Sequence, residues 1–179
     1  MIIDKSLSIN TLTVQKVLTR MAAQIFELIH FQKELKIFAI QPRGKLVADY
    51  LKRILLNNFN TEIEVNTIDP TFFRDDLKSN PNIIIPSESH ISFDFENQSI
   101  LLIDDVIFTG RTTRAAIEAL FQYGRPKSIK TMVLVNRNLD RETPISTDYE
   151  GFKINLDSGT KIKIIEIEEN YLQLTLSNE

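Results

Sequence analysis

The chain contains no cysteine, and this excludes both a disulfide framework and a zinc site built from thiolates. Only two histidines occur among the 179 residues, which leaves few ligands for a metal-dependent hydrolase. Five glycines and six prolines are too few for flexible linkers or low-complexity segments. No apolar run approaches the roughly 20 residues of a membrane-spanning helix, and residues 1–5 lack the apolar region of a signal peptide. We therefore expect a cytoplasmic protein without a membrane partner.

The composition that remains is that of an ordinary globular protein, with 42% hydrophobic and 25% charged residues. The length fits one domain, here residues 1–179. The formal net charge of −3 gives no overall attraction to nucleic acid. Function must therefore be inferred from local motifs.

The most informative stretch is residues 99–113, SILLIDDVIFTGRTT. Its aliphatic run at residues 100–103 predicts a strand buried on both faces, and Asp104 and Asp105 follow at once. A polar turn then leads into an amphipathic helix predicted over residues 114–123. The turn is formed by Thr109, Gly110, Arg111, Thr112 and Thr113.

This order of strand, acidic pair, turn and helix places polar groups where open α/β sheets bind ligands, beyond the carboxyl ends of the strands. Backbone N–H groups at a helix N-terminus bind anions, so the turn favours a phosphate. The acidic pair favours hydroxyl groups or a divalent cation. A sugar phosphate satisfies both requirements.

A second strand–turn–helix unit lies earlier in the chain. Residues 36–40 predict a short strand, and residues 45–56 predict a helix. Arg43 and Lys45 stand at the turn between them, again at the carboxyl end of a strand. A cationic turn in this place suits a second anionic group of the same ligand.

The other segments complete an α/β pattern. We expect a long amphipathic helix over residues 11–31, an edge strand over 62–68 and a buried strand over 129–135. The proline-containing excursion over residues 69–98 is typical of a lid, and Arg74 within it would swing over a bound ligand.

The C-terminal part begins with a polar loop predicted over residues 136–144, which should overhang the same crevice. Short strands are predicted over 152–156, 161–167 and 171–176, the last two as a hairpin. The expected fold class is therefore α/β, with a mostly parallel central sheet, helices on both faces and a small appendage built from the tail.

Other phosphate-binding classes lack their motifs here. Neither Gly-x-Gly-x-x-Gly after a strand nor Gly-x-x-x-x-Gly-Lys-Ser/Thr occurs. A phosphoacceptor receiver domain would need an acidic pair near its first strand, where this chain begins with a helix instead. These classes are set aside.

The run ILLIDDVIFTGRTT resembles the phosphoribosyl-pyrophosphate signature of the type I phosphoribosyltransferases. Further motifs follow the order of one branch, the pyrimidine-operon attenuation regulators that are also uracil phosphoribosyltransferases. The resemblance runs from the first helix to Gly151. Its motifs are Leu18-Thr19-Arg20, Pro42-Arg43-Gly44, Phe73-Arg74-Asp75-Asp76-Leu77, Gly124-Arg125-Pro126-Lys127-Ser128-Ile129, Arg141-Glu142-Thr143-Pro144-Ile145 and Asp148-Tyr149.

The resemblance implies the type I phosphoribosyltransferase fold, with a lid at residues 69–98 and a hood formed largely from residues 136–179. It implies transfer of phosphoribose to a nucleobase, uracil first, in pyrimidine nucleotide salvage. Mg²⁺ would arrive chelated by the diphosphate of phosphoribosyl pyrophosphate and not be held directly by the protein, with Asp104 as the one candidate for a protein ligand. The protein would be a homodimer.

The same resemblance assigns roles to individual residues. Asp104 and Asp105 would accept hydrogen bonds from the ribose hydroxyls, and residues 109–113 would hold the 5′-phosphate. Pro42-Arg43-Gly44 would form the pyrophosphate loop, which in the family often holds a cis peptide, and Arg74 would close over the pyrophosphate. The base would lie against Phe108, Asn136 and Arg137.

Three departures from the branch concern the base and RNA. Phe108 replaces a tyrosine, and residues 136–140 replace a shorter base-recognising loop. Ala23, Asp140 and Ser146 stand where the regulators carry His or Arg on their RNA face, and fewer cations weaken phosphate binding. We therefore rank catalysis above the two alternatives, a UMP-responsive RNA-binding regulator and a catalytically weak nucleotide-binding relative.

Overall fold

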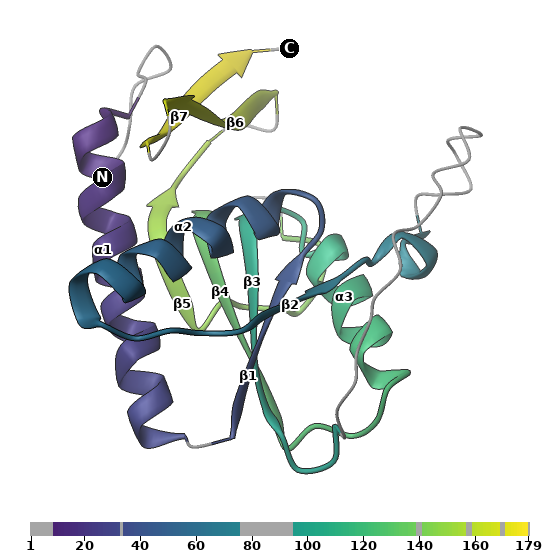
Figure 1. The fold of residues 1–179 in the computed structure, drawn as a ribbon. Coiled ribbons are helices and arrows are strands. Elements are labelled where there is room, and N and C mark those ends of the chain that lie inside the picture. Colours follow the sequence, from purple (N-terminus) through teal and green to yellow (C-terminus); the bar gives the residue numbers. More distant parts are fainter. Residues whose placement is uncertain are drawn as a thin grey trace.

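A five-stranded parallel sheet forms the centre of the computed structural model, with strand order β2-β1-β3-β4-β5 (Figure 1). The structure describes residues 9–32, 34–75, 95–138, 141–156, 159–168 and 171–178. The central part of the predicted lid, residues 76–94, lies outside them, as does Asp140. The elements are α1 (Thr11–Phe31), β1 (Leu35–Ile40), α2 (Arg43–Phe59), β2 (Val65–Ile68), the 3₁₀ turn η1 (Thr71–Phe73), β3 (Ser99–Ile107), α3 (Arg111–Phe121), β4 (Ser128–Arg137), β5 (Tyr149–Ile154), β6 (Thr160–Glu168) and β7 (Tyr171–Asn178).

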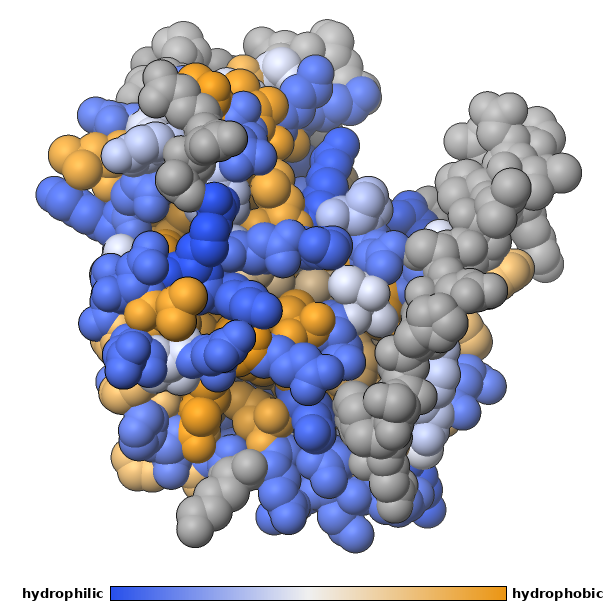
Figure 2. Space-filling view, viewed as in Figure 1, coloured by the Kyte–Doolittle hydropathy of each residue, from blue (hydrophilic) through white to orange (hydrophobic). Residues whose placement is uncertain are grey.

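Helices cover both faces of this sheet, as the sequence predicted, with α1 and α2 on one face and α3 on the other (Figure 1). Successive residues of a strand point to opposite faces. Accordingly, Ile37 and Ala39 of β1 pack under α1 and α2, whereas Phe38 and Ile40 pack under α3. Both faces of the sheet are buried under helices, which explains why the sequences of the strands are continuous apolar runs. On the face viewed in Figure 2, hydrophilic side chains predominate and hydrophobic ones form separate groups.

The helix α1 has the predicted bounds. Asn10 caps it, because its side-chain oxygen accepts a hydrogen bond from Leu12 N at 2.9 Å. The buried residues recur at helical spacing and form one apolar stripe against the sheet. No helix within the described ranges is long and apolar enough to cross a membrane.

The hairpin β6–β7 is a separate antiparallel sheet, as predicted for the tail. Its buried Leu172 and Leu174 join the core under α1 and α2. On the side of α2, the hydroxyl of Tyr50 donates to Glu166 Oε1 at 2.7 Å. The hairpin is therefore fixed above the carboxyl ends of the parallel strands (Figure 1).

Several predicted boundaries were wrong in the same way, because polar residues were taken as strand or helix ends. Strand β3 continues through Asp104 and Asp105, since its ladder with β4 still pairs Val106 with Val135. Backbone hydrogen bonding does not depend on side-chain polarity, so the ladder continues where the apolar pattern stops. For the same reason β4 includes Asn136 and Arg137, which we expected in a loop.

Other boundaries also differ. Helix α3 begins at Arg111, three residues before the predicted start, and α2 spans residues 43–59 instead of 45–56. The edge strand β2 covers only residues 65–68 of the predicted 62–68, although its edge position is confirmed. Residues 149–154 extend the main sheet as β5. Within the described part of residues 136–179, the range expected to form the hood, β6 and β7 form a sheet of their own and β5 belongs to the main sheet.

Candidate functional site

The acidic pair lies at the carboxyl-terminal half of β3 and is buried, with 6% of Asp104 and 7% of Asp105 exposed. Asp104 Oδ1 accepts a hydrogen bond from Asp105 N, and Asp105 Oδ1 accepts one from Val106 N, both at 2.8 Å. Each carboxylate is thus fixed by the next peptide N–H. Burial raises the pKa of both carboxyls, and for Asp104 the charge of Asp105 adds to this effect.

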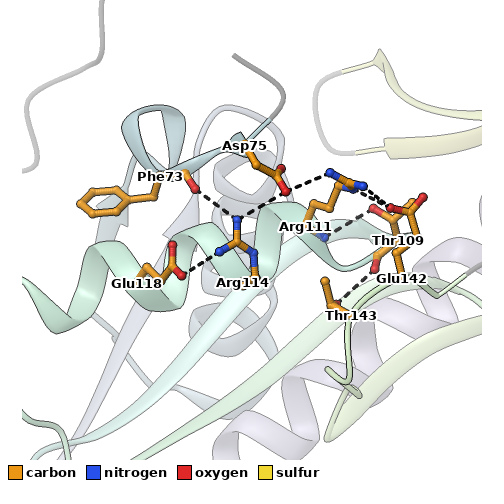
Figure 3. A network of polar contacts seen from close by, with 8 residues as sticks. All are labelled: Phe73, Asp75, Thr109, Arg111, Arg114, Glu118, Glu142 and Thr143. Carbon is orange, nitrogen blue, oxygen red and sulfur yellow. Dashed lines mark hydrogen bonds and ion pairs between the residues drawn. The ribbon is translucent and has the colours of Figure 1, made fainter. Parts of the chain in front are cut away.

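The predicted phosphate turn connects β3 to the N-terminus of α3. Gly110 stands at the N-cap with φ +86°, a left-handed conformation that glycine adopts without a Cβ penalty. First-turn N–H groups of α3 and the positive end of its dipole face this turn, as an anion site requires. Thr113 is buried, whereas Arg111 is directed to Glu142 and Asp75, at 2.6 and 2.9 Å (Figure 3).

The cationic turn of residues 41–44 lies beside the acidic pair. Its Gln41–Pro42 peptide is cis, which the sequence could not show. Gly44 allows α2 to pack closely against β3, because a Cβ at this position would stand only 2.6 Å from the carbonyl oxygen of Ile103. This close approach holds Arg43 next to Asp104 and Asp105.

These elements enclose one cavity of about 540 Å³. It brings together eight of the residues proposed from the sequence: Pro42, Arg43, Arg74, Asp104, Asp105, Phe108, Thr112 and Arg137. Arg74 reaches the phosphate turn from the root of the predicted lid, with its Nη1 3.4 Å from Thr112 Oγ1. The cavity is thus lined by two carboxylates at its floor and by guanidinium groups around them.

The three residues proposed to contact the base line two different cavities in the structure. The guanidinium of Arg137 lies over the Phe108 ring, with Cζ 3.7 Å from its centroid, so both side chains border the cavity as a pair. Asn136 instead lines a neighbouring cavity of about 530 Å³, where it donates to Glu150 Oε2 at 2.6 Å. Its proposed contact with the base is not supported by this orientation.

Sequence reasoning missed the contribution of the hairpin to this cavity. Lys161, Ile162 and Lys163 of β6 line it opposite the sheet. The Lys-Ile-Lys alternation was a signal that both lysines share one face of a strand. Only the docking of the hairpin shows that this face meets the cavity.

Comparison with known proteins identifies the family. Residues 9–171 match the model of the phosphoribosyl transferase domain. The chain belongs to this family. Its sequence is 38% identical over 151 residues to the bifunctional protein PyrR of Nostoc punctiforme, covering 84% of each chain. It is 34% identical over 175 residues to the bifunctional protein PyrR of Clostridium novyi, covering 90% of this chain and 98% of that protein.

Solved structures agree on the phosphoribosyltransferase fold. The hypoxanthine phosphoribosyltransferase of Trypanosoma cruzi superposes with a TM-score of 0.64 at 18% identity, covering 88% of this chain and 85% of that one. The hypoxanthine phosphoribosyltransferase of Staphylococcus aureus gives 0.60 at 18%, with 88% and 81% covered. The fold and the family inferred from the motifs are confirmed.

The family implies Mg²⁺, and the donor set can be tested against it. Within the described ranges, no group of three or more His, Asp or Glu side chains could hold a metal ion. Mg²⁺ characteristically keeps several waters and binds through one or two carboxylates together with substrate phosphates. Asp104 and Asp105 fit this way of binding, in which the ion is held mainly by the diphosphate of the substrate.

Proposed function

We propose that this phosphoribosyltransferase transfers the phosphoribosyl group of phosphoribosyl pyrophosphate to uracil, forming UMP and pyrophosphate. The observation that carries the proposal is the cavity in which two buried carboxylates face Arg43, Arg74 and the phosphate turn. The 34–38% identity to proteins named PyrR supports a pyrimidine base. The setting we propose is cytoplasmic nucleotide salvage.

Each part of the cavity has a role in this proposal. Asp104 and Asp105 accept hydrogen bonds from the 2′ and 3′ hydroxyls of ribose, and the N-terminus of α3 holds the 5′-phosphate. Arg43 and Arg74 bind the diphosphate, together with the lysines of β6. Phe108 and Arg137 border the place of the base.

The reaction exchanges one bond at C1 of ribose for another. The C1–O bond to the diphosphate breaks, and a C1–N bond to the base forms. Pyrophosphate leaves with the electron pair of the broken C1–O bond and takes up the proton that the ring nitrogen of the base loses. The cations of the cavity stabilise charge that develops on the leaving oxygen. Asp104 and Asp105 would hold Mg²⁺ together with the diphosphate, and the ion would supply further neutralisation of the charge on the diphosphate.

Incubation of the protein with Mg²⁺, phosphoribosyl pyrophosphate and a panel of uracil, hypoxanthine, guanine and adenine tests the proposal. UMP should form with uracil. The double variant Asp104→Asn with Asp105→Asn should lose turnover, whereas Glu62→Gln with Glu64→Gln, two exposed carboxylates outside this cavity, should keep it. Unaltered turnover in the first double variant would refute the site assignment.

The base is tested separately by the melting temperature in the presence of UMP, GMP or IMP. A ligand that binds the native state raises the midpoint by mass action, independently of catalysis. UMP should give the largest shift. Binding of UMP without turnover of any base would instead identify the protein as a catalytically weak nucleotide-binding relative.

A second function, UMP-responsive binding of RNA, is favoured by the relatives that are named bifunctional. A gel-shift with pyrimidine-operon leader RNA tests it, with and without UMP. Unchanged mobility in both conditions would exclude it.

We also propose a homodimer, which the mass from light scattering would show directly.

A further inference from the structure

Residues 141–143 lie against the start of the phosphate turn and hold two carbonyl oxygens there, those of Phe108 and Thr109. Arg141 Nη1 donates to Phe108 O at 2.5 Å. Thr109 O accepts three hydrogen bonds, from Glu142 N at 3.0 Å and from Thr143 N and Thr143 Oγ1 at 3.1 Å each. We call residues 141–143 the clasp. Figure 3 shows two of its residues, Glu142 and Thr143, beside Thr109.

The clasp determines where the N–H groups of the turn point. In a trans peptide, the C=O and the following N–H point in opposite directions. The carbonyls of Phe108 and Thr109 are held toward the clasp, so the N–H groups of Thr109 and Gly110 are directed away from it. These N–H groups stand immediately before the N-terminus of α3, which begins at Arg111.

The side chain of Arg141 is itself held in place by a second hydrogen bond. Its Nη2 donates to Asn136 Oδ1 at 2.8 Å, and Asn136 in turn donates to Glu150 on β5 at 2.6 Å. Asn136 is buried on β4, with 7% exposed. The chain of contacts therefore anchors the turn to β4 and to its neighbour, the edge strand β5.

Arg141 lines the neighbouring cavity and not the one that holds Asp104 and Asp105. It contacts a residue that lines that cavity, Phe108, through the backbone carbonyl oxygen directly before the turn. The approach of the clasp is close, because a Cβ on Gly110 would overlap the hydroxyl of Thr143. Glycine at this position and the clasp are thus sterically matched.

We propose that Arg141 and Thr143 are positioning residues, which preorganise the N–H groups of Thr109 and Gly110 for the 5′-phosphate. The inference rests on the proposed function in one respect, that this turn binds a phosphate. Preorganised donors bind an anion more tightly because their orientation does not have to be fixed on binding. The clasp should therefore contribute to binding of the phosphate and not to binding of the nucleoside.

The test compares the affinities of UMP and uridine by calorimetry in four clasp variants. Arg141→Met should weaken UMP about tenfold or more, the range expected when one hydrogen bond to a charged group is lost, with uridine changed less than about twofold. Arg141→Lys should be intermediate, because an ammonium lacks the planar fork that reaches both Phe108 and Asn136. Thr143→Val should lower the UMP-to-uridine ratio, and Thr143→Ser, which keeps the hydroxyl, should restore it.

Arg20→Met is the matched control. Arg20 also donates to backbone carbonyls, those of Glu150 and Gly151 at 3.0 and 2.6 Å, but outside the turn. Its ratio of affinities should equal that of the unaltered protein. Should UMP and uridine weaken in parallel in the clasp variants, the role would be structural and the proposal overturned. An unchanged ratio in both Arg141→Met and Thr143→Val would overturn it equally.

Failure of the proposed function gives a different result. In that case the unaltered protein forms no nucleotide from phosphoribosyl pyrophosphate. The clasp proposal needs no turnover, only that the unaltered protein binds UMP more tightly than uridine. If the unaltered protein shows no such preference, the turn is not a phosphate site and the clasp proposal is refuted as well.

Discussion

Gly44, in the first turn of α2, lies directly against the backbone of Asp104 on β3. A Cβ on Gly44 would stand 3.1 Å from Asp104 Cα and 2.6 Å from the carbonyl oxygen of Ile103. Two segments separated by 60 residues in the chain therefore meet backbone to backbone. This contact sets the position of the cationic turn relative to the acidic pair.

Gly44→Ala should destabilise the protein, although alanine is normally more stabilising than glycine within a helix. Relieving the overlap requires backbone shifts, which typically cost about 1–3 kcal/mol. The melting temperature should fall by about 2–4 °C per kcal/mol, and affinity for UMP should fall because Asp104 is displaced. Gly159→Ala is the control, since no atom lies within 4 Å of the added Cβ. Equal stability of the two variants would contradict the proposed close contact.

Asp104→Asn should stabilise the ligand-free protein at neutral pH while weakening UMP binding. Burial raises the pKa of Asp104 in the folded state, so between the unfolded and folded pKa values the folded state binds more protons than the unfolded state. The free energy of unfolding therefore decreases as pH rises through that window. The amide cannot ionise and avoids this cost.

Urea denaturation of both proteins between pH 4 and pH 8 measures this effect. The unaltered protein should lose stability with rising pH relative to Asp104→Asn, and the gap should be widest at the neutral end. Glu64→Gln, at an exposed position, should leave the curve nearly unchanged. A variant less stable than the unaltered protein at pH 7 would disprove the assignment of a desolvation cost.

Arg74→Met should lower kcat/KM for phosphoribosyl pyrophosphate by about 10- to 100-fold, the value of a hydrogen bond to a charged group. Arg74 borders the cavity beside Thr112, at the root of the predicted lid. Binding of UMP, which has no diphosphate, should change much less. Steady-state kinetics with Arg125→Met, an exposed arginine outside the cavity, provide the comparison. An equal loss for UMP would place Arg74 elsewhere in the site.

Lys161→Gln and Lys163→Gln should each raise KM for phosphoribosyl pyrophosphate by up to about fivefold, because exposed charge pairs contribute about 0.2–1 kcal/mol. Both lysines are exposed and line the cavity from β6. Their effect should shrink with added salt, since mobile ions screen exposed charges. Lys127→Gln, an exposed lysine at the amino-terminal ends of the strands, should behave like the unaltered protein at every salt concentration. A salt-independent increase would argue against an electrostatic role.

Much of the candidate site could be predicted because its polar residues lie in short contiguous stretches of the sequence. Asp104, Asp105 and the phosphate turn fall within ten residues, and the order strand, acids, turn and helix is sufficient to place them at one edge of a sheet. The cationic turn at Arg43 could be assigned by the same rule. Parallel strands bring their carboxyl ends together, so local motifs become neighbours without any knowledge of the packing.

Strand and helix ends could not be located as well. The residues after the apolar run of β3 are polar, and Asn136 and Arg137 after β4 are polar too, yet both ladders continue through them. Side-chain pattern reports burial, whereas hydrogen bonding between backbones determines where a strand ends. The two coincide in the core and differ at the site, where polar residues are buried for function.

The sequence by itself determined the fold class and the family, and it predicted the candidate residues for the sugar and its phosphates, because each depends on contiguous motifs. Tertiary structure alone decided which distant segments complete the cavity. Lys161 and Lys163 reach it because the hairpin docks on α2, and Arg141 holds the phosphate turn because the sheet anchors it through Asn136. Asn136 lines the neighbouring cavity, where it donates to Glu150. The contacts Tyr50–Glu166 and Phe108–Arg141 join residues 116 and 33 positions apart, and their geometry depends on packing that no local pattern encodes.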